Sequence, residues 1–129
     1  MKRHTLKLFM FALILTLVFS LFPGHLLKVL AISPNVAISQ VYGGGGNAGA
    51  TFKNDYIELF NLGGAPVDLT GWTVQYASSA GTSWSKTILS GTIQAGGYYL
   101  IQEAAGTGGT VSLPTPDVTG SIAMSATAA

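Results

Sequence analysis

The residue types that could perform chemistry are concentrated in GGGGNAGATFKND, residues 43–55. Gly44, Gly46 and Gly49 match G-x-G-x-x-G, a dinucleotide-binding pattern in which glycines admit a pyrophosphate and the following helix points its N-terminus at the charge. The next residues, ATFKNDYIELF, alternate like a strand, so the sequence does not supply the required βαβ unit. A P-loop also fails, because Ala50 stands where lysine is needed. We therefore interpret the stretch as a loop between two strands and predict no cofactor in it.

Oxygen-bearing side chains follow the glycines and raise a second chemistry. Asn54, Asp55 and Glu58 are candidate calcium ligands, since exported domains use such oxygens near glycine-rich loops. The spacing is not that of an EF-hand loop. In the alternative reading, Asn54 and Asp55 shape the entry to a strand. Glu58 then pairs with Lys53 or Lys86, or accepts backbone hydrogen bonds at a sheet edge.

Aromatic residues raise a third chemistry. Tyr42, Trp84 and Tyr98 are candidate binding-surface residues, because a row of aromatic side chains on a β-sandwich can stack against sugars. Aromatic residues at strand spacing also build cores and protein interfaces. The sequence leaves both readings open.

Histidine and cysteine are confined to the beginning of the sequence. His4 and His25 are the two histidines, and there is no cysteine. Residues 32–129 therefore lack the parts of a Ser-His-Asp or Cys-His relay and of a His or Cys zinc site. We predict no catalytic residues and no enzyme activity for this part of the chain.

The first residues resemble an export signal. Lys2, Arg3 and Lys7 precede or begin a charge-free run, LFMFALILTLVFSLF, which Pro23 ends. Small residues around Ala31 complete the pattern of a secretory signal peptide, residues 1–31, which is expected to form a helix and to be cleaved. The alternative is an uncleaved membrane anchor, for which the run is shorter than the roughly 20 residues that a spanning helix needs.

The charge after this segment limits the partners. Residues 32–129 carry two lysines and five carboxylates, a formal charge of −3, although the whole chain has +1. Two lysines neutralise few phosphates, so no direct nucleic-acid binding is expected. A membrane is expected as a partner only if the signal segment stays uncleaved. The predicted location is secreted, extracellular or at the cell surface.

The remaining segments alternate with a period of two and are separated by glycine and proline turns, which favours a single all-β domain. Ile57 and Leu59 are expected to face inward, and Trp72, Val74 and Tyr76 to share one face. The predicted strands are residues 36–42, 55–61, 72–77, 85–89, 98–103 and 121–124. Residues 104–120 are predicted to be a long loop. The expected architecture is an antiparallel sandwich or barrel.

Three of these segments in order resemble one family. NDYIELFN, PVDLTGWTVQY and LPTPDVTGSIAMSATA are similar to the lamin tail domain, bacterial secreted type, over residues 36–128. The resemblance implies an immunoglobulin-like antiparallel β-sandwich without catalytic residues, occupying residues 32–129. It also implies a binding or targeting module of an exported bacterial protein, whose partner is an unidentified protein or a cell-surface component.

The resemblance also leaves alternatives for the role of the chain. The family pattern continues into a further strand, typically beginning G-K-V-A-L, whereas this sequence ends at Ala129. We therefore expect a sandwich that lacks its last strand. The chain could be the N-terminal fragment of a secreted nuclease or phosphatase whose catalytic domain lies elsewhere. A carbohydrate-binding module is the other alternative.

Overall fold

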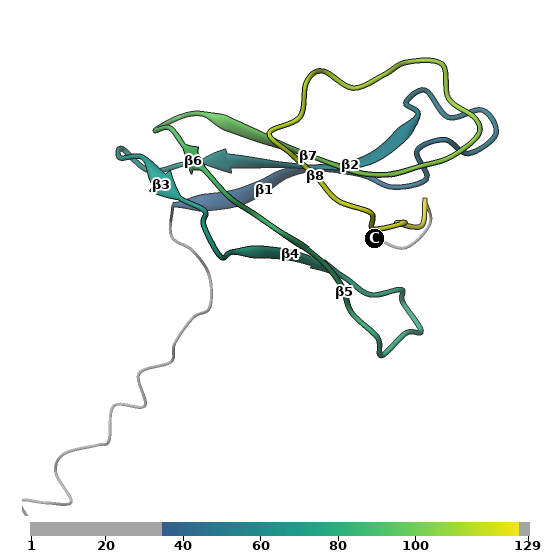
Figure 1. The fold of residues 1–129 in the computed structure, drawn as a ribbon, viewed down its shortest axis with the longest axis horizontal. Helices are drawn as coiled ribbons and strands as arrows, with labels where there is room; N and C mark the ends of the chain where they lie inside the picture. Colours follow the sequence, from purple (N-terminus) through teal and green to yellow (C-terminus); the bar gives the residue numbers. More distant parts are fainter. Residues whose placement is uncertain (1–34, 127–129) are drawn as a thin grey trace, which may run out of the picture. The chain divides into compact units, whose positions relative to one another are not determined.

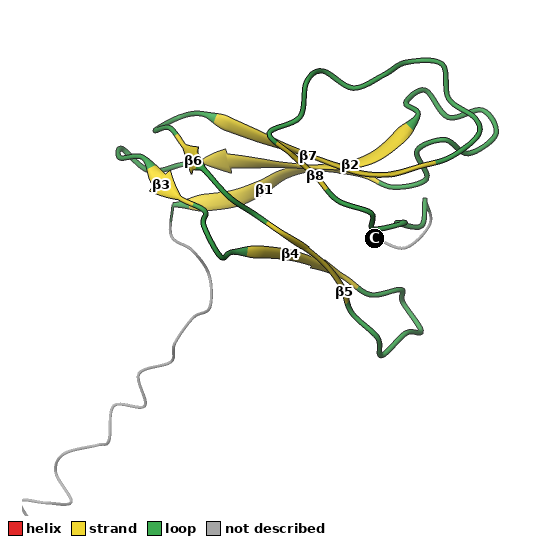
Figure 2. Cartoon of the chain, viewed as in Figure 1, coloured by secondary structure: helices red, strands yellow, loops and turns green. Residues whose placement is uncertain are grey.

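The computed structural model describes residues 35–126, which fall within one compact unit. The predicted signal helix, residues 1–31, lies outside the described residues. Within residues 35–126 the chain forms strands, turns and loops, and no helix long and apolar enough to cross a membrane occurs there (Figure 2). The prediction of an all-β domain is confirmed for the described part.

Eight strands make up the described fold. They are β1 (Val36–Tyr42), β2 (Asn54–Asn61), β3 (Val67–Asp68), β4 (Thr73–Tyr76), β5 (Ser85–Ile88), β6 (Thr92–Ile93), β7 (Tyr98–Ala105) and β8 (Val118–Thr119). The five longer strands follow the predicted segments closely, because each contains a run of alternating or β-favouring residues that is long enough to be recognised. The two-residue strands β3, β6 and β8 are too short to show one and were not predicted.

The largest sheet has the order β1-β2-β7-β8. The strongest alternation in the sequence builds its centre: along β2, Ile57 and Leu59 are buried while Tyr56 and Glu58 are half-buried. Antiparallel pairing joins β1 to β2 and β2 to β7, but β8 runs parallel to β7. The expectation of a purely antiparallel sandwich is therefore wrong at this edge, where the chain returns through the long loop.

A second layer faces this sheet across the core. It consists of the antiparallel pairs β4-β5 and β3-β6, and Figure 1 shows the β4-β5 hairpin facing the sheet. Side chains of both layers form the buried cluster Ile57, Leu59, Leu69, Val74, Leu89, Ile93, Tyr99, Ile101, Ile122 and Met124. This arrangement agrees with the predicted immunoglobulin-like sandwich.

The core does not extend under the whole of β1. Ile38 pairs with Leu59 and Val41 with Ile57, so both lie on the core side of the sheet. Each is nevertheless 59% exposed. β1 thus contributes an apolar margin that the described part of the second layer leaves uncovered.

Three local predictions differ from the structure. Residues 121–124 are buried at Ile122 and Met124 but form no strand. Residues 104–120 are not loop throughout, since β7 continues to Ala105 and β8 lies within them. Trp72 precedes β4 and is 39% exposed, because it closes a turn in which its N–H donates to the carbonyl of Leu69 at 2.9 Å.

Candidate functional site

The glycine loop between β1 and β2 uses its backbone amides internally. The N–H groups of Gly44, Gly45 and Gly46 donate to the Met124 carbonyl, the Asp55 carboxylate and the Phe52 carbonyl, at 3.1, 2.6 and 2.8 Å. A phosphate cradle requires such amides to point at the ligand instead. The strand β2, not a helix, follows the loop. Both observations support the reading of residues 43–55 as a connection between strands.

The glycines are needed because two backbones meet here. A Cβ at Gly46, whose φ is 71°, would collide with the backbone of Gly106. The Gly108 N–H donates to the Gly46 carbonyl at 2.6 Å. The loop after β1 therefore packs directly on the loop after β7, and side chains larger than hydrogen would separate them.

Asp55 is buried at the base of this loop and joins two distant segments. Its Oδ1 accepts the N–H of Gly45 and its Oδ2 accepts the N–H of Met124, each at 2.6 Å. Hydrogen bonds of this kind to an ionised acceptor are among the stronger ones in proteins. Both oxygens of Asp55 are thus used to fix the backbone.

Glu103 in β7 has the same role toward the same C-terminal segment. Its Oε2 accepts the N–H of Ile122 at 2.8 Å, and the Ala104 N–H donates to the Ile122 carbonyl at 3.0 Å. Carboxylates therefore replace strand carbonyls as acceptors for residues 122–124. This explains why residues 121–124 bury Ile122 and Met124 without pairing as a strand.

Two polar atoms beside this contact lack a partner. Glu103 Oε1 and Thr87 Oγ1 are buried and have no hydrogen-bond partner within residues 35–126. A Cβ added at Gly120 would collide with the Thr87 hydroxyl and the Glu103 carboxylate. The three residues therefore pack tightly where β5, β7 and the C-terminal segment meet.

Glu58 lies on the other face of β2 from Asp55. Its Oε1 accepts the Ser39 hydroxyl at 2.6 Å. Ser39 reaches it because the pairing of β1 with β2 shifts between Ile38 and Gln40, a bulge that re-aims the side chain. Neither Lys53 nor Lys86 forms an ion pair with Glu58 among the described contacts, so the predicted lysine pairing does not occur there.

The candidate calcium ligands Asn54, Asp55 and Glu58 are therefore not gathered in one place. Asp55 faces inward and Glu58 outward, while the Asn54 side chain donates to the Glu103 carbonyl at 3.0 Å. Within residues 35–126 no three acidic, histidine or cysteine side chains are placed to hold a metal ion.

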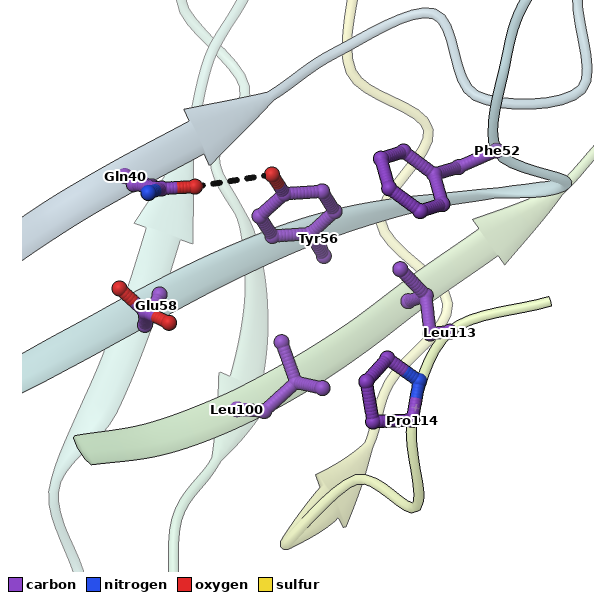
Figure 3. A pocket seen from close by; sticks show the side chains of 7 residues that line it. All are labelled: Gln40, Phe52, Tyr56, Glu58, Leu100, Leu113 and Pro114. Atoms are coloured by element: carbon purple, nitrogen blue, oxygen red, sulfur yellow. Dashed lines mark hydrogen bonds between the residues drawn. The ribbon is translucent and has the colours of Figure 1, made fainter. Parts of the chain in front are cut away.

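Glu58 instead lines a pocket on the outer face of the sheet. The pocket has a volume of about 200 Å³, and Figure 3 shows its lining side chains, which come from β1, the loop between β1 and β2, β2, β7 and the loop after β7. The lining residues are Gln40, Phe52, Tyr56, Glu58, Leu100, Leu113 and Pro114. Gln40, Glu58 and Leu100 are direct cross-strand neighbours, so the floor is one row of the sheet.

Aromatic rings form one wall of the pocket. Tyr56 stacks on Tyr42 with ring centroids 5.4 Å apart and planes at 7°. Phe52 meets both rings edge-on, at 5.4 Å from Tyr42 and 5.7 Å from Tyr56. The Tyr56 hydroxyl donates to Gln40 Oε1 at 3.0 Å. The wall is therefore fixed by packing and by a hydrogen bond.

The three aromatic candidates from the sequence lie in three places. Tyr42 stacks on Tyr56, which lines the pocket, but does not line the pocket itself. Tyr98 is 63% exposed and packs on Phe60, with ring centroids 4.7 Å apart, at the opposite end of β2 from Tyr56. Trp84 is 66% exposed and directly precedes β5 in the other layer. They do not form a single stacking platform.

The sequence identified only part of this site. The sequence singled out Glu58 as a charged residue in mid-strand. It also singled out Tyr42, which stacks on the pocket residue Tyr56, as a candidate surface aromatic residue. Leu113 and Pro114 were missed, because they belong to a loop whose position over the sheet follows from contacts distant in sequence. Those contacts include the Lys53 N–H, which donates to the Val111 carbonyl at 2.9 Å.

Comparison with known proteins agrees with this architecture. The lamin tail domain family matches residues 31–128. No curated protein matches the sequence, and no solved structure matches it. The family consists of non-catalytic, immunoglobulin-like domains. With the family match covering most of its length, the chain belongs to the lamin tail domain family.

Proposed function

We propose that residues 32–129 form a binding module that recruits a partner protein through the outer face of the sheet β1-β2-β7. The observation that carries the proposal is the pocket itself. It combines an aromatic wall, apolar side chains and one carboxylate on a face that the core does not use. Concave sites with few polar groups among apolar ones are typical of binding surfaces.

The order of the pocket supports the same proposal. The Leu100 N–H donates to Asp117 at 2.7 Å, and the Asp117 N–H returns a bond to the Leu100 carbonyl at 2.9 Å. At its other end, the loop is tied to residues 51–53 through Val111. The segment that carries Leu113 and Pro114 is thus held at both ends. A site fixed before binding loses less entropy when a partner binds.

Site-specific cross-linking tests this proposal. A photoreactive amino acid at Leu113 is expected to capture one partner protein from the producing organism, and the same group at Gly64, at a turn outside the pocket, is not. The captured protein is then purified and titrated against the full chain by calorimetry. Equal capture at both positions, or no heat of binding with the purified protein, would refute the proposal.

We further propose that the module acts outside the cytoplasm. The basic start, apolar run and small residues around Ala31 support this assignment. Mass spectrometry of the exported protein is expected to give Ile32 as the first residue. A protein that keeps residues 1–31 and fractionates with membranes would support the anchored alternative instead.

The rival functions predict different measurements. A fragment that retained nuclease or phosphatase chemistry would turn over substrate as a purified chain, whereas we expect none. A carbohydrate-binding module would bind on a glycan array and lose that binding in Trp84→Ala. The separation of Tyr42, Trp84 and Tyr98 gives this alternative less support than the protein-binding proposal has.

A further inference from the structure

The pocket contains one carboxylate with no positive partner. Glu58 is half-buried, and its Oε1 accepts a hydrogen bond from the Ser39 hydroxyl. No ion pair to Glu58 occurs within residues 35–126. A carboxylate accepts through about four lone-pair sites. Glu58 therefore retains acceptor capacity toward the pocket, at a position where partial burial strengthens its attraction for a cation.

The other polar groups of the pocket add acceptors. The Tyr56 hydroxyl donates its hydrogen bond to Gln40 Oε1, so its oxygen is left to accept a hydrogen bond from a ligand. The Tyr56 ring has one face against Tyr42, and the pocket lies against the rest of the ring. Aromatic faces attract cations through their quadrupole. The carboxylate, the phenol oxygen and the ring all favour a ligand that is positively charged and rich in donors.

The remaining lining suits the stem of a long side chain. Leu100 lies beside Glu58 on the floor of the pocket, and Leu113 and Pro114 continue the apolar lining on the side away from the carboxylate. Lysine and arginine carry apolar methylene stems below a charged head. A pocket of about 200 Å³ accommodates one such side chain. The described residues are also acidic overall, with two lysines and five carboxylates, so a basic partner is attracted from a distance.

We propose that this pocket binds an arginine or lysine side chain of the partner protein, with the cationic head at Glu58 and against Tyr56 and the methylene stem along Leu100, Leu113 and Pro114. The inference rests on the proposed function and specifies its partner: a protein that presents an exposed basic side chain.

Peptide titration of the full chain tests the charge preference. The probes are acetylated, amidated Gly-Ser-Arg-Ser-Gly, its lysine counterpart, and versions with citrulline or norleucine at the central position. NMR amide shifts are expected at Gln40, Tyr56, Glu58 and Leu113 with the two basic peptides. Citrulline keeps the shape of arginine without the charge, and norleucine keeps the stem of lysine. Equal shifts with the neutral peptides, or no shifts with the basic ones, overturn the inference.

Matched variants test the residue that is proposed to carry the selectivity. Glu58→Gln is nearly isosteric and keeps an acceptor for Ser39, and it is expected to weaken binding of the arginine peptide by about tenfold. Asp68→Asn makes the same charge change at the exposed end of β3 and is expected to leave binding within about twofold. Equal weakening in both variants, or full binding by Glu58→Gln, contradicts the proposal.

A second variant keeps the test valid if Glu58→Gln does not fold. Leu113→Lys places a cation at the mouth of the pocket and is expected to compete with the peptide, while Leu113→Met is expected to bind normally. Unchanged binding by Leu113→Lys contradicts the proposal. Peptide binding without a cross-linked protein partner would sustain the pocket chemistry and refute the proposed function. A cross-linked partner without peptide selectivity would support the proposed function and refute the inference that the pocket binds a basic side chain.

Discussion

Asp55 and Met124 are linked by a hydrogen bond of 2.6 Å between the Oδ2 of one and the backbone N–H of the other, 69 positions apart in the sequence. The second oxygen of the same carboxylate accepts from Gly45. One buried side chain thus connects the strand entry, the glycine loop and the C-terminal segment. Its importance for stability can be measured directly.

Asp55→Asn is expected to destabilise the protein by about 2–4 kcal/mol, because hydrogen bonds to a charged group contribute about 1.5–3 kcal/mol each and the new amide nitrogen would face an N–H donor. Urea unfolding monitored by tryptophan fluorescence provides the measurement. Asp68→Asn is the control: it retains the oxygen that accepts the Thr70 N–H at 2.8 Å, so little change is expected. Similar losses in the two variants would contradict the bridging role of Asp55.

Thr87→Val is expected to leave stability unchanged or to raise it by up to about 1 kcal/mol, since the buried hydroxyl it removes has no partner within residues 35–126. Valine has nearly the same shape, so packing against Gly120 is retained. Thermal unfolding in parallel with the parent protein checks this. A loss of more than about 1 kcal/mol would show that the hydroxyl has a stabilising partner.

Gly120→Ala is expected to destabilise the protein by about 1–3 kcal/mol, because the added methyl group overpacks the contact between Thr87 and Glu103. Gly64→Ala is the matched control, as a Cβ there meets nothing within 4 Å. Chemical unfolding of the two variants is compared at equal concentration. The prediction fails if both variants unfold at the same denaturant concentration.

Tyr99 gives the fold a sensitivity to alkali. Burial, and secondarily the negative charge of Asp117, raise the pKa of its hydroxyl, which donates to the Ser90 carbonyl at 2.7 Å. The neutral form is favoured in the folded state. The contribution of Tyr99 to the free energy of unfolding is therefore complete below the ordinary tyrosine pKa of about 10. It is lost as the pH rises through the higher pKa of the folded state.

Tyr99→Phe is expected to cost about 1 kcal/mol at neutral pH, through the lost hydrogen bond, and to flatten the alkaline decline. Unfolding free energies measured across the alkaline range, with tyrosinate absorbance recorded alongside, check both effects. An unaltered alkaline decline in the variant would refute the assignment to Tyr99.

Asp68 acts at the opposite end of the pH scale. Hydrogen bonds from the hydroxyl and the backbone N–H of Thr70 lower the pKa of its carboxyl. The stabilisation that Asp68 provides is present above the ordinary pKa of a carboxyl group. It disappears as the pH falls through the lowered pKa of the folded state. NMR titration is expected to place the Asp68 pKa below 3.8 in the parent protein and closer to 3.8 in Thr70→Ala. Identical titration curves in the two proteins would exclude the Thr70 contacts as the cause.

The sequence predicted the strands that carry their own periodic signal. In β2, the buried positions of Ile57 and Leu59 follow from alternation alone. It could not predict the conformation of residues 121–124, because the N–H groups of Ile122 and Met124 donate to the side chains of Glu103 and Asp55 and not to the carbonyls of another strand. Periodicity indicates which face of a strand is buried, but it does not indicate which group accepts a backbone hydrogen bond.

The pocket was predictable only in part, for a similar reason. Glu58 and Tyr42 could be recognised as unusual in their local context. Leu113 and Pro114 reach the pocket through the parallel contact between Phe52 and Val111, which joins loops 59 positions apart. No local sequence pattern encodes a contact between two loops so far apart, so the position of Leu113 and Pro114 beside the pocket is known only from the folded structure.

The dependence of Asp55 on Met124 also has a consequence for synthesis. Residues are made in order, so the Asp55 carboxylate emerges from the ribosome long before its second hydrogen-bond donor. Until residues 120–126 follow, the two buried carboxylates of the central strands, Asp55 and Glu103, face an unfinished core, where an unpaired charge is costly. We therefore expect the part of the domain that the structure describes to close only once residues 120–126 have been translated, because they supply these two donors.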